Sequence, residues 1–229
     1  MEPFAFQPSA RASVAINGLI ERFPVHRIYC VGRNFADHAK EMGVEATKDE
    51  PVFFMKPADA ITQSAQIPYP PQTRNFHHEV ELVVALGPDI PQQLSIENAE
   101  LAIFAYGIGI DLTRRDLQAA AKAKGLPWDT SKGFDHSAPT SALILKQHAD
   151  ISDQTRLNLT VNGQLRQTAT LGEMIFSVPE IITALSKLYQ LKAGDLIFMG
   201  TPAGVAALQS NDEFTATLEG VVSFSARIS

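Results

Sequence analysis

The chain of 229 residues contains one cysteine, one tryptophan and no long uncharged apolar run. Its lone cysteine, Cys30, cannot form an intrachain disulfide, so we expect a reducing compartment and place the protein in the cytoplasm. No window reaches the ~18 apolar residues that a membrane-spanning helix needs. Residues 1–22 lack the basic start and apolar core of a secretory signal. The sequence therefore predicts a protein with no membrane partner.

An excess of positive charge is also lacking. The chain has 19 Lys and Arg residues against 25 Asp and Glu residues, a formal net charge of −6. Such a balance provides no basic surface for nucleic acid, so we expect no nucleic-acid partner. If the ligand is an anion, the binding site itself must supply the positive charge.

Several motifs of common enzyme classes are missing. The sequence has neither a P-loop nor the G-x-S-x-G motif of a serine nucleophile. Gly107-x-Gly109 lacks the third glycine of a dinucleotide loop, and Asp111 follows where a phosphate would lie. No group of Cys and His residues has the spacing of zinc ligands. Nucleotide, serine-hydrolase and zinc chemistry are therefore not indicated.

What is present is a strand pattern over 75–86, NFHHEVELVVAL. Glu79 and Glu81 lie on one face of this strand, about 6.5–7 Å apart at Cα. Val83 and Ala85 continue the same face, and burial there would make two neighbouring negative charges costly. A divalent cation with oxygen ligands would relieve that cost. The pattern leaves open the alternative of a solvated strand face.

Asp111 is the third acidic residue of interest. It ends the apolar run AIFAYGIGID, which is typical of a buried strand that opens onto something polar. Its carboxylate could simply cap the following helix. If it joins Glu79 and Glu81, the three carboxylates form an all-oxygen site, and such a site suits Mg²⁺ or Mn²⁺.

Two histidines are candidates for the same site. His38 and Glu41 are three residues apart on a predicted helix and share one face. A carboxylate beside an imidazole raises its basicity and fixes its tautomer, as a general base requires; the alternative is a surface i,i+3 pair. His77 shares the face of the acidic pair and is either a ligand, a support for one, or a partly exposed strand residue.

Many short strands and few short helices favour one α+β, β-rich domain over a regular βαβ alternation. We expect residues 1–25 to form an N-terminal extension and residues 26–229 the main domain. Asn162-Gly163, between two strand-like segments, is a strong hairpin signal.

Three helices are predicted from their end signals. Asn34 is the candidate N-cap of a helix over 35–42, and Thr113 that of a helix over 114–124. Ser177-Val178-Pro179-Glu180 is a capping box for a third. We expect the third helix to have an apolar face made of Ile181, Ile182, Leu185, Leu188 and Tyr189.

Seven blocks of the sequence, in order over residues 26–205, resemble the fumarylacetoacetate hydrolase family. The resemblance is greatest to the short, single-domain branch that includes the fumarylpyruvate and acylpyruvate hydrolases. The blocks are YCVGRNFADHAKEMG (29–43), FFMKPADA (53–60), HHEVELVVALG (77–87), GIGIDLTRRDLQ (107–118), KGLPWDTSKGFDHSAPTS (124–141), LTVNGQLRQ (159–167) and GDLIFMGTPAGV (194–205).

The resemblance implies a mixed-sheet β-roll with a few short helices, a homodimer, and a divalent metal, Mg²⁺ or Mn²⁺. It assigns roles to residues at matching positions. The expected metal ligands are Glu79, Glu81 and Asp111. The expected catalytic residues are His38 and Glu41, as the dyad that activates water, and Lys132, beside the developing enolate. The expected substrate-binding residues are Arg33, Lys56, Arg115, Gln118 and Thr201.

The function implied is metal-dependent hydrolysis of a carbon–carbon bond in a small anionic 2,4-dioxo acid. The expected reaction converts fumarylpyruvate to fumarate and pyruvate in aromatic catabolism. Three alternatives stay open: an oxaloacetate decarboxylase, a tautomerase or isomerase of dienedioates, and a non-catalytic metal-binding scaffold.

Overall fold

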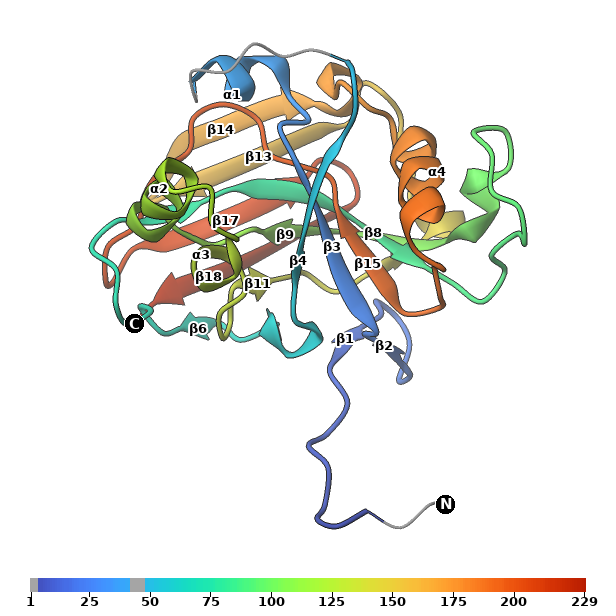
Figure 1. Ribbon diagram of the computed structural model, residues 1–229, viewed down its shortest axis with the longest axis horizontal. Helices are drawn as coiled ribbons and strands as arrows, with labels where there is room; N and C mark the ends of the chain where they lie inside the picture. The colour runs from blue at the N-terminus through green and yellow to red at the C-terminus, as the bar shows by residue number, and fades with distance from the viewer. Residues whose placement is uncertain (1–3, 42–47) are drawn as a thin grey trace.

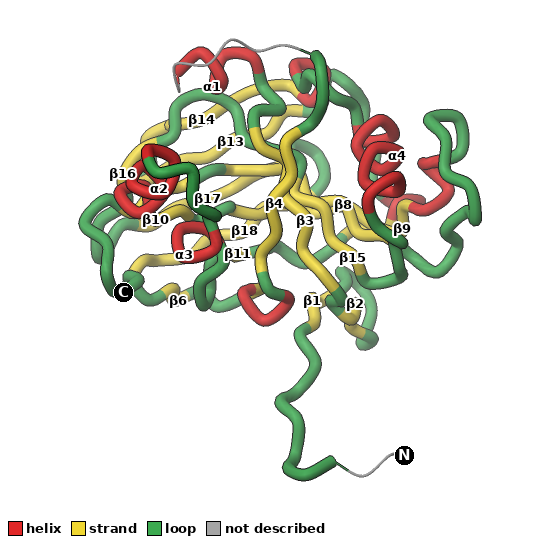
Figure 2. Tube along the Cα trace, in the orientation of Figure 1, coloured by secondary structure: helices red, strands yellow, loops and turns green. Residues whose placement is uncertain are grey.

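Two mixed β-sheets pack against each other in the computed structural model, which describes residues 4–41 and 48–229 (Figures 1 and 2). The larger sheet has six strands, in which β15 and β3 are parallel and all other neighbours are antiparallel. Their spatial order is β12 (Ile144–Leu145), β9 (Ile103–Ile110), β8 (Val80–Leu86), β15 (Asp195–Phe198), β3 (Arg27–Gly32) and β4 (Val52–Lys56).

The second sheet has five strands, and it contains the predicted hairpin. Asn162 and Gly163 have φ of 51° and 75°, the left-handed values that a two-residue turn between antiparallel strands requires. The hairpin prediction is confirmed. The order is β14 (Gln164–Thr170), β13 (Arg156–Val161), β17 (Glu213–Leu218), β18 (Val222–Ile228) and β6 (Gln66–Ile67), with only β18 and β6 parallel.

Short elements complete the chain. A three-stranded sheet consists of β10 (Thr113–Arg114), β7 (Phe76–His78) and β16 (Ala206–Ala207), and two pairs consist of β1 (Ser13–Ala15) with β2 (Arg22–Pro24) and β11 (Ala138–Pro139) with β5 (Ile61–Thr62). The α-helices are α1 (Ala36–Glu41), α2 (Arg115–Ala123), α3 (Asp129–Lys132) and α4 (Val178–Leu188). The 3-10 turns are Ala58–Ala60, Ala99–Ala102, Lys146–His148 and Leu171–Glu173. The predicted α+β, β-rich class is confirmed, and no helix within the described ranges is long and apolar enough to cross a membrane.

Both faces of the six-stranded sheet are buried. One face forms the larger core with the five-stranded sheet, where Leu82 packs with Leu157. The other face forms a second core, in which Val83 and Phe198 pack with Val14 and Phe23 of the β1–β2 hairpin. Strand β8 is consequently buried at all seven positions. A strand covered on both sides has no solvated face, so an acidic side chain near its start must find partners inside the protein.

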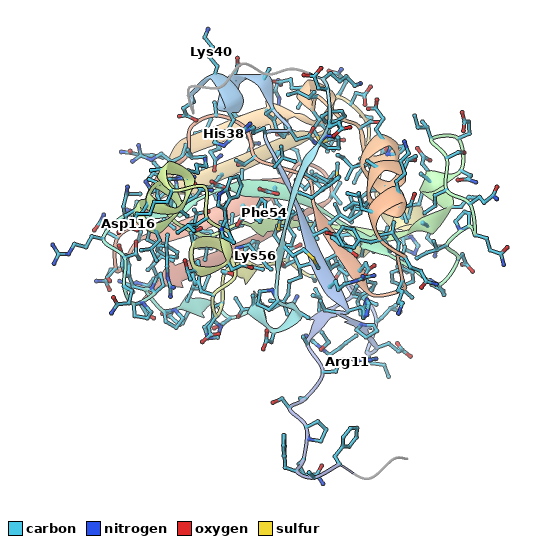
Figure 3. The ribbon with its side chains drawn as sticks, viewed as in Figure 1. Arg11, His38, Lys40, Phe54, Lys56 and Asp116 are labelled. Carbon is cyan, nitrogen blue, oxygen red and sulfur yellow. The ribbon has the colours of Figure 1, made fainter. Side chains whose placement is uncertain are left out.

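The N-terminal residues divide into two parts. The β1–β2 hairpin belongs to the second core, whereas residues 4–10 are exposed and lead away from the body, with Arg11 near the junction (Figures 1 and 3). The division of the chain at residue 25 stays a prediction.

Two of the predicted helix features need correction. The N-cap of α2 is Arg114, because Thr113 belongs to β10 and its hydroxyl donates to the Asp111 carbonyl at 3.1 Å. In α4 the capping box of Ser177 and Glu180 is present as predicted. Leu188, however, is 65% exposed in the last turn, and Tyr189 is the exposed C-cap residue, so neither joins the buried face of that helix.

Asn34 does not cap α1. Its buried side chain accepts from the Phe176 N–H at 2.8 Å, and donates to the Phe176 carbonyl at 3.1 Å and the Met199 carbonyl at 2.8 Å. The end of β3 is thereby tied to the segment before α4 and to the end of β15. Gly200 passes so close that a Cβ there would lie 2.7 Å from that of Asn34, and its φ of 91° also favours glycine.

We expect Asn34→Ala to lower the free energy of unfolding by about 2–4 kcal/mol, because it leaves the polar atoms of Phe176 and Met199 buried without their partner. Urea unfolding followed by circular dichroism measures the loss. Asn158→Ala is the matched control, since its side chain pairs with Thr168 at an exposed position; it should cost less than about 1 kcal/mol. Equal losses in the two variants would contradict the structural role of Asn34.

Candidate active site

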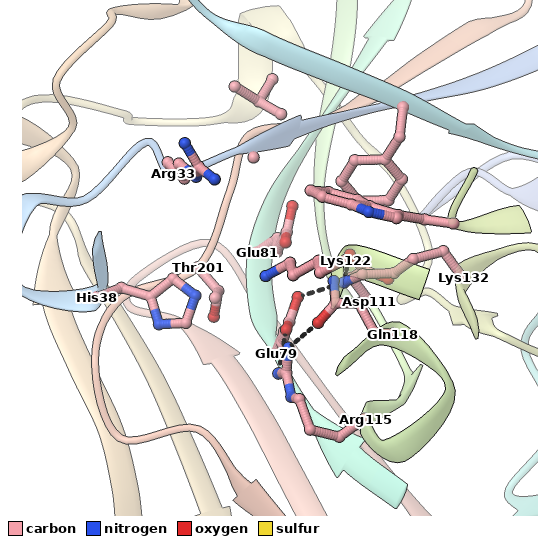
Figure 4. Close-up of a pocket in the computed structure, with 14 residues that line it drawn as sticks. Arg33, His38, Glu79, Glu81, Asp111, Arg115, Gln118, Lys122, Lys132 and Thr201 are labelled. Carbon is pink, nitrogen blue, oxygen red and sulfur yellow. Dashed lines mark hydrogen bonds and ion pairs between the residues drawn. The ribbon is translucent and has the colours of Figure 1, made fainter. Parts of the chain in front are cut away.

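The pairing of β8 with β9 brings the three acidic residues together. In this antiparallel register Glu81 lies opposite Gly109, and the Asp111 N–H donates to the Glu79 carbonyl at 2.8 Å. One carboxylate oxygen from each of Glu79, Glu81 and Asp111 lies within 4.8 Å of the other two. All three side chains are buried. Residues 30 positions apart thus form one acidic cluster at the floor of a pocket (Figure 4).

Three cationic side chains surround this cluster. The Lys132 ammonium donates to Glu79 Oε2 and Asp111 Oδ2, both at 2.6 Å. Arg115 forms an ion pair with the other Glu79 oxygen. Burial alone would raise the pKa of Glu79, but Lys132 and Arg115 outweigh it and hold that pKa far below its usual range. Burial would likewise lower the pKa of Lys132, but Asp111 and Glu79 raise it, so Lys132 stays charged.

Lys56 supports the cluster from behind. Its ammonium is 2.8 Å from Asp111 Oδ1 and donates to the backbone carbonyls of Leu112 and Lys132. Although Asp111 Oδ1 lies at ion-pair distance from this ammonium, it accepts no hydrogen bond among the described residues. Lys56 is fully buried and does not line the pocket.

Glu81 differs from the other two acids. The Gly200 N–H donates to Glu81 Oε2 at 2.7 Å, but within residues 4–41 and 48–229 no cationic side chain forms an ion pair with it. Burial, together with repulsion by Asp111 and Glu79, holds the pKa of Glu81 well above its usual range. The cluster therefore contains a carboxylate, Glu81, that no cation neutralises, and an Asp111 oxygen that accepts no hydrogen bond. All the metal ligands that it offers are oxygen atoms. These properties fit a divalent cation such as Mg²⁺ or Mn²⁺.

His38 faces the acidic cluster across the pocket, beside Thr201 (Figure 4). Its Nδ1 is 3.3 Å from Glu41 Oε2, one turn along α1. This contact leaves Nε2 as the nitrogen available to the pocket. His38 is buried, whereas the Glu41 side chain is 37% exposed. The pair has the geometry of a general base with an orienting carboxylate.

A face of α2 forms another wall. Arg115, Gln118 and Lys122 line the pocket at positions i, i+3 and i+7 of this helix. Arg115 donates to Gln118 Oε1 at 2.6 Å. Lys122 was not among the predicted residues, although its spacing from Arg115 and Gln118 is a signal that could have found it.

Arg33 lies at the opposite rim. It follows β3 with a φ of 60°, an uncommon left-handed conformation for a residue with a side chain, and it is exposed. Figure 4 shows it across the pocket from α2.

Gln167 is a second residue that the sequence analysis missed. Its amide donates to Thr201 Oγ1 at 2.8 Å and its carbonyl accepts from His78 Nδ1 at 2.8 Å. Gln167 therefore orients Thr201 from below the pocket and leaves the hydroxyl proton of Thr201 free to donate. The available signal was its position in β14, where it shares the buried face with Ala169.

His77 contacts Arg115 and is not part of the acidic cluster. Its Nε2 is 2.7 Å from Asn75 Oδ1, and Arg115 Nε approaches its Nδ1 at 3.5 Å. Burial and the neighbouring guanidinium lower the pKa of His77 to about 4, so the ring is neutral at physiological pH. His77 thus supports Arg115, which in turn holds Glu79.

Comparison with known proteins agrees with this fold and site. The protein-family model described as fumarylacetoacetate (FAA) hydrolase C-terminal matches residues 27–229 of this chain. The oxaloacetate tautomerase YcgM of Escherichia coli K12 is 42% identical over 205 residues, 89% of this chain and 93% of that protein. A mitochondrial oxaloacetate tautomerase of Rattus norvegicus is 44% identical over 200 residues, 86% of this chain and 88% of that protein.

Solved structures give a second line of similarity. Fumarylpyruvate hydrolase from Pseudomonas aeruginosa, in complex with Mn²⁺ and pyruvate, superposes with a TM-score of 0.93 at 39% identity, covering 99% of both chains. A putative fumarylpyruvate hydrolase from Burkholderia cenocepacia has a TM-score of 0.91 at 45% identity, covering 99% of this chain and 98% of that one. The mixed-sheet fold that the resemblance implied is therefore confirmed, and the acidic cluster of this chain can hold a divalent metal ion of the kind bound in the P. aeruginosa structure. The chain belongs to the fumarylacetoacetate hydrolase family.

Proposed function

We propose that this protein hydrolyses a carbon–carbon bond in 2,4-dioxo acids and that fumarylpyruvate, cleaved to fumarate and pyruvate, is its substrate. The observation that carries the proposal is the placement of the His38–Glu41 pair opposite the acidic cluster, within one pocket. A base that can activate water thus faces the place where a chelating keto acid would be held. The similar P. aeruginosa hydrolase, in complex with Mn²⁺ and pyruvate, supports it.

Glu79, Glu81 and Asp111 would hold the metal, which when bound supplies Lewis-acid stabilisation of the negative charge that develops on the substrate oxygens. His38 Nε2 takes a proton from water while Glu41 keeps the ring oriented through Nδ1. The water oxygen attacks the C4 carbonyl, and the C3–C4 bond breaks with its electron pair passing to C3. The products at this stage are a carboxylic acid and the enolate of pyruvate.

Lys132 and His38 complete the reaction in this scheme. The raised pKa of Lys132, caused by Asp111 and Glu79 against the effect of burial, keeps an ammonium beside the enolate oxygen. His38 then returns its proton to C3, which gives pyruvate and restores the free base. Arg115, Gln118 and Thr201 would position the substrate from the walls of the pocket.

Oxaloacetate tautomerisation is a second candidate, favoured by the 42% and 44% identity to oxaloacetate tautomerases. The same His38 could move a proton between C3 and the C2 oxygen, which interconverts the keto and enol forms without consuming water or breaking a carbon–carbon bond. Decarboxylation of oxaloacetate would release CO₂ instead and needs no attack by water.

A panel of three substrates separates these reactions. Fumarylpyruvate, acetylpyruvate and oxaloacetate are incubated with Mg²⁺ or with EDTA, and pyruvate is measured through lactate dehydrogenase while the oxaloacetate enol is followed by ultraviolet absorbance. We expect Mg²⁺-dependent pyruvate from fumarylpyruvate. Faster enol–keto exchange of oxaloacetate, with no pyruvate from either dioxo acid, would favour the tautomerase. Pyruvate from oxaloacetate alone would favour the decarboxylase.

The remaining expectations extend this proposal. We place the enzyme in the cytoplasm, in aromatic catabolism, and as a homodimer with residues 26–229 as its catalytic domain. The family match over residues 27–229 supports this range for the catalytic domain.

A further inference from the structure

Among the residues that the structure describes, five cationic side chains lie in or directly behind the pocket, and three of them form ion pairs with the acidic cluster. Lys132 is held by Glu79 and Asp111, Arg115 by Glu79, and Lys56 is buried behind Asp111. The charges of these three are already largely balanced by the acidic cluster, so they give little net attraction to a second carboxylate. The two remaining cations are Lys122 and Arg33.

Lys122 lines the pocket but belongs to no ion pair within residues 4–41 and 48–229. It is solvent-exposed at the pocket mouth, and Figure 4 shows its ammonium pointing inward from α2. Partial burial, followed by repulsion from Arg115 and Arg33, lowers its pKa. Burial is the larger cause, so the ammonium at this place has lost part of its hydration and also has two cationic neighbours. An anion placed here would relieve both effects.

Trp128 fixes where the Lys122 ammonium lies. Lys122 Nζ is 5.1 Å from the centroid of the indole ring, within the range of a cation–π contact. Trp128 also lines the pocket and packs against Phe54, with ring centroids 5.8 Å apart. Because a π face accepts only weak hydrogen bonds, this contact leaves the Lys122 ammonium able to donate to a ligand in the pocket.

We propose that Lys122, assisted by Arg33 from the opposite rim, binds the second carboxylate of a dicarboxylate substrate and so sets its preference for dicarboxylates over monocarboxylates. The acidic cluster and its metal hold the keto-acid end, and Lys122 lies toward the mouth, where the far end of the substrate extends. This inference rests on the proposed function for the class of substrate. It goes further by assigning selectivity to Lys122, a residue outside the metal site and the His38–Glu41 pair.

The test compares two substrates that differ at the far end. Fumarylpyruvate carries a terminal carboxylate, whereas acetylpyruvate carries a methyl group. Loss of a charge-assisted hydrogen bond corresponds to a factor of about 10–100. We therefore expect Lys122→Met to lower the ratio of kcat/KM for fumarylpyruvate over acetylpyruvate by about 10–100-fold, chiefly through KM. Lys122→Arg should retain most of the ratio. Lys124→Met, an exposed change just past the end of α2, should leave it unchanged.

A binding measurement keeps this inference separate from the proposed function. Calorimetry on the Mg²⁺-loaded protein compares 2-oxoheptanedioate, which has the chain length of fumarylpyruvate, with 2-oxoheptanoate, which has a methyl group in place of the terminal carboxylate. The wild type should bind 2-oxoheptanedioate more tightly, and Lys122→Met should remove most of that difference. If no dioxo acid is cleaved but the difference depends on Lys122, the proposed function fails and the assignment stands. If the difference in affinity between the two acids were the same in Lys122→Met as in the wild type, the assignment of Lys122 would be overturned, whatever the enzyme cleaves.

Discussion

Glu81→Gln is expected to abolish metal binding and activity together. Glu81 is the one acid of the cluster with no cationic partner among the described residues, so its charge is the one most dependent on a metal ion. Loss of residues that only orient metal ligands lowers metal affinity about 10–100-fold, and loss of a ligand charge should cost at least as much. Calorimetric titration with Mn²⁺ or Mg²⁺ measures the affinity directly.

The same variant should not unfold the protein. The pKa of Glu81 is raised by burial and by Asp111 and Glu79, so its ionised form destabilises the metal-free fold, and this cost grows as pH rises above the unfolded-state pKa of the residue. Glutamine removes the charge, and its carbonyl can still accept from the Gly200 N–H. We therefore expect the metal-free variant to have a Tm at pH 7 equal to or above that of the metal-free wild type. Glu219→Gln, an exposed change in the β17–β18 turn, is the control. Unchanged Mg²⁺ affinity in the Glu81 variant would contradict its assignment as a ligand.

His38→Ala is expected to lower kcat by about 10²–10⁴-fold, the usual contribution of a positioned general base. Metal affinity should be retained, because His38 is not a member of the acidic cluster. Single-turnover measurements with fumarylpyruvate and calorimetric titration with Mn²⁺ give the two quantities separately.

His148→Ala is the matched control, since that histidine is exposed in a 3-10 turn and does not line the pocket. Its turnover should equal that of the wild type. Added imidazole should restore part of the activity of the His38 variant if the ring acts as a base. Near-normal turnover of His38→Ala would remove the dyad from the reaction.

The parts of the fold that were predicted correctly depend on short-range signals. Asn162-Gly163 and the Ser177–Glu180 box act through backbone conformation and hydrogen bonds within four residues, so no distant partner is needed to recognise them. Thr113 failed as a cap because its backbone pairs with His77 in a small sheet, and long-range pairing overrode the local preference. The prediction that Leu188 is buried was wrong, because helical periodicity gives the direction in which a side chain points but not how far along the helix the neighbouring core extends.

The acidic cluster could be anticipated because alternation places Glu79 and Glu81 on one face and an apolar run leads to Asp111. Their meeting depends on the β8–β9 register, which the sequence alone leaves open. Gln167 and Asn34 act through hydrogen bonds to residues at least 34 positions away, and although alternation places Gln167 on a buried face, no local pattern identifies the partners of either residue. The burial of Lys56 was also hidden, since a lysine after a strand is usually solvated.

Because β8 is buried on both sides, substitutions in this strand have a larger structural effect than substitutions at the mouth of the pocket. Glu81 lies within a strand enclosed by two cores, so a side chain of another size or shape there would disturb the packing around it. Lys122 and Arg33 project from the outer turn of a helix and from the end of a strand, where a different side chain displaces no core packing. New substrate preferences can therefore evolve at the mouth of the pocket while the inherited reaction centre stays intact.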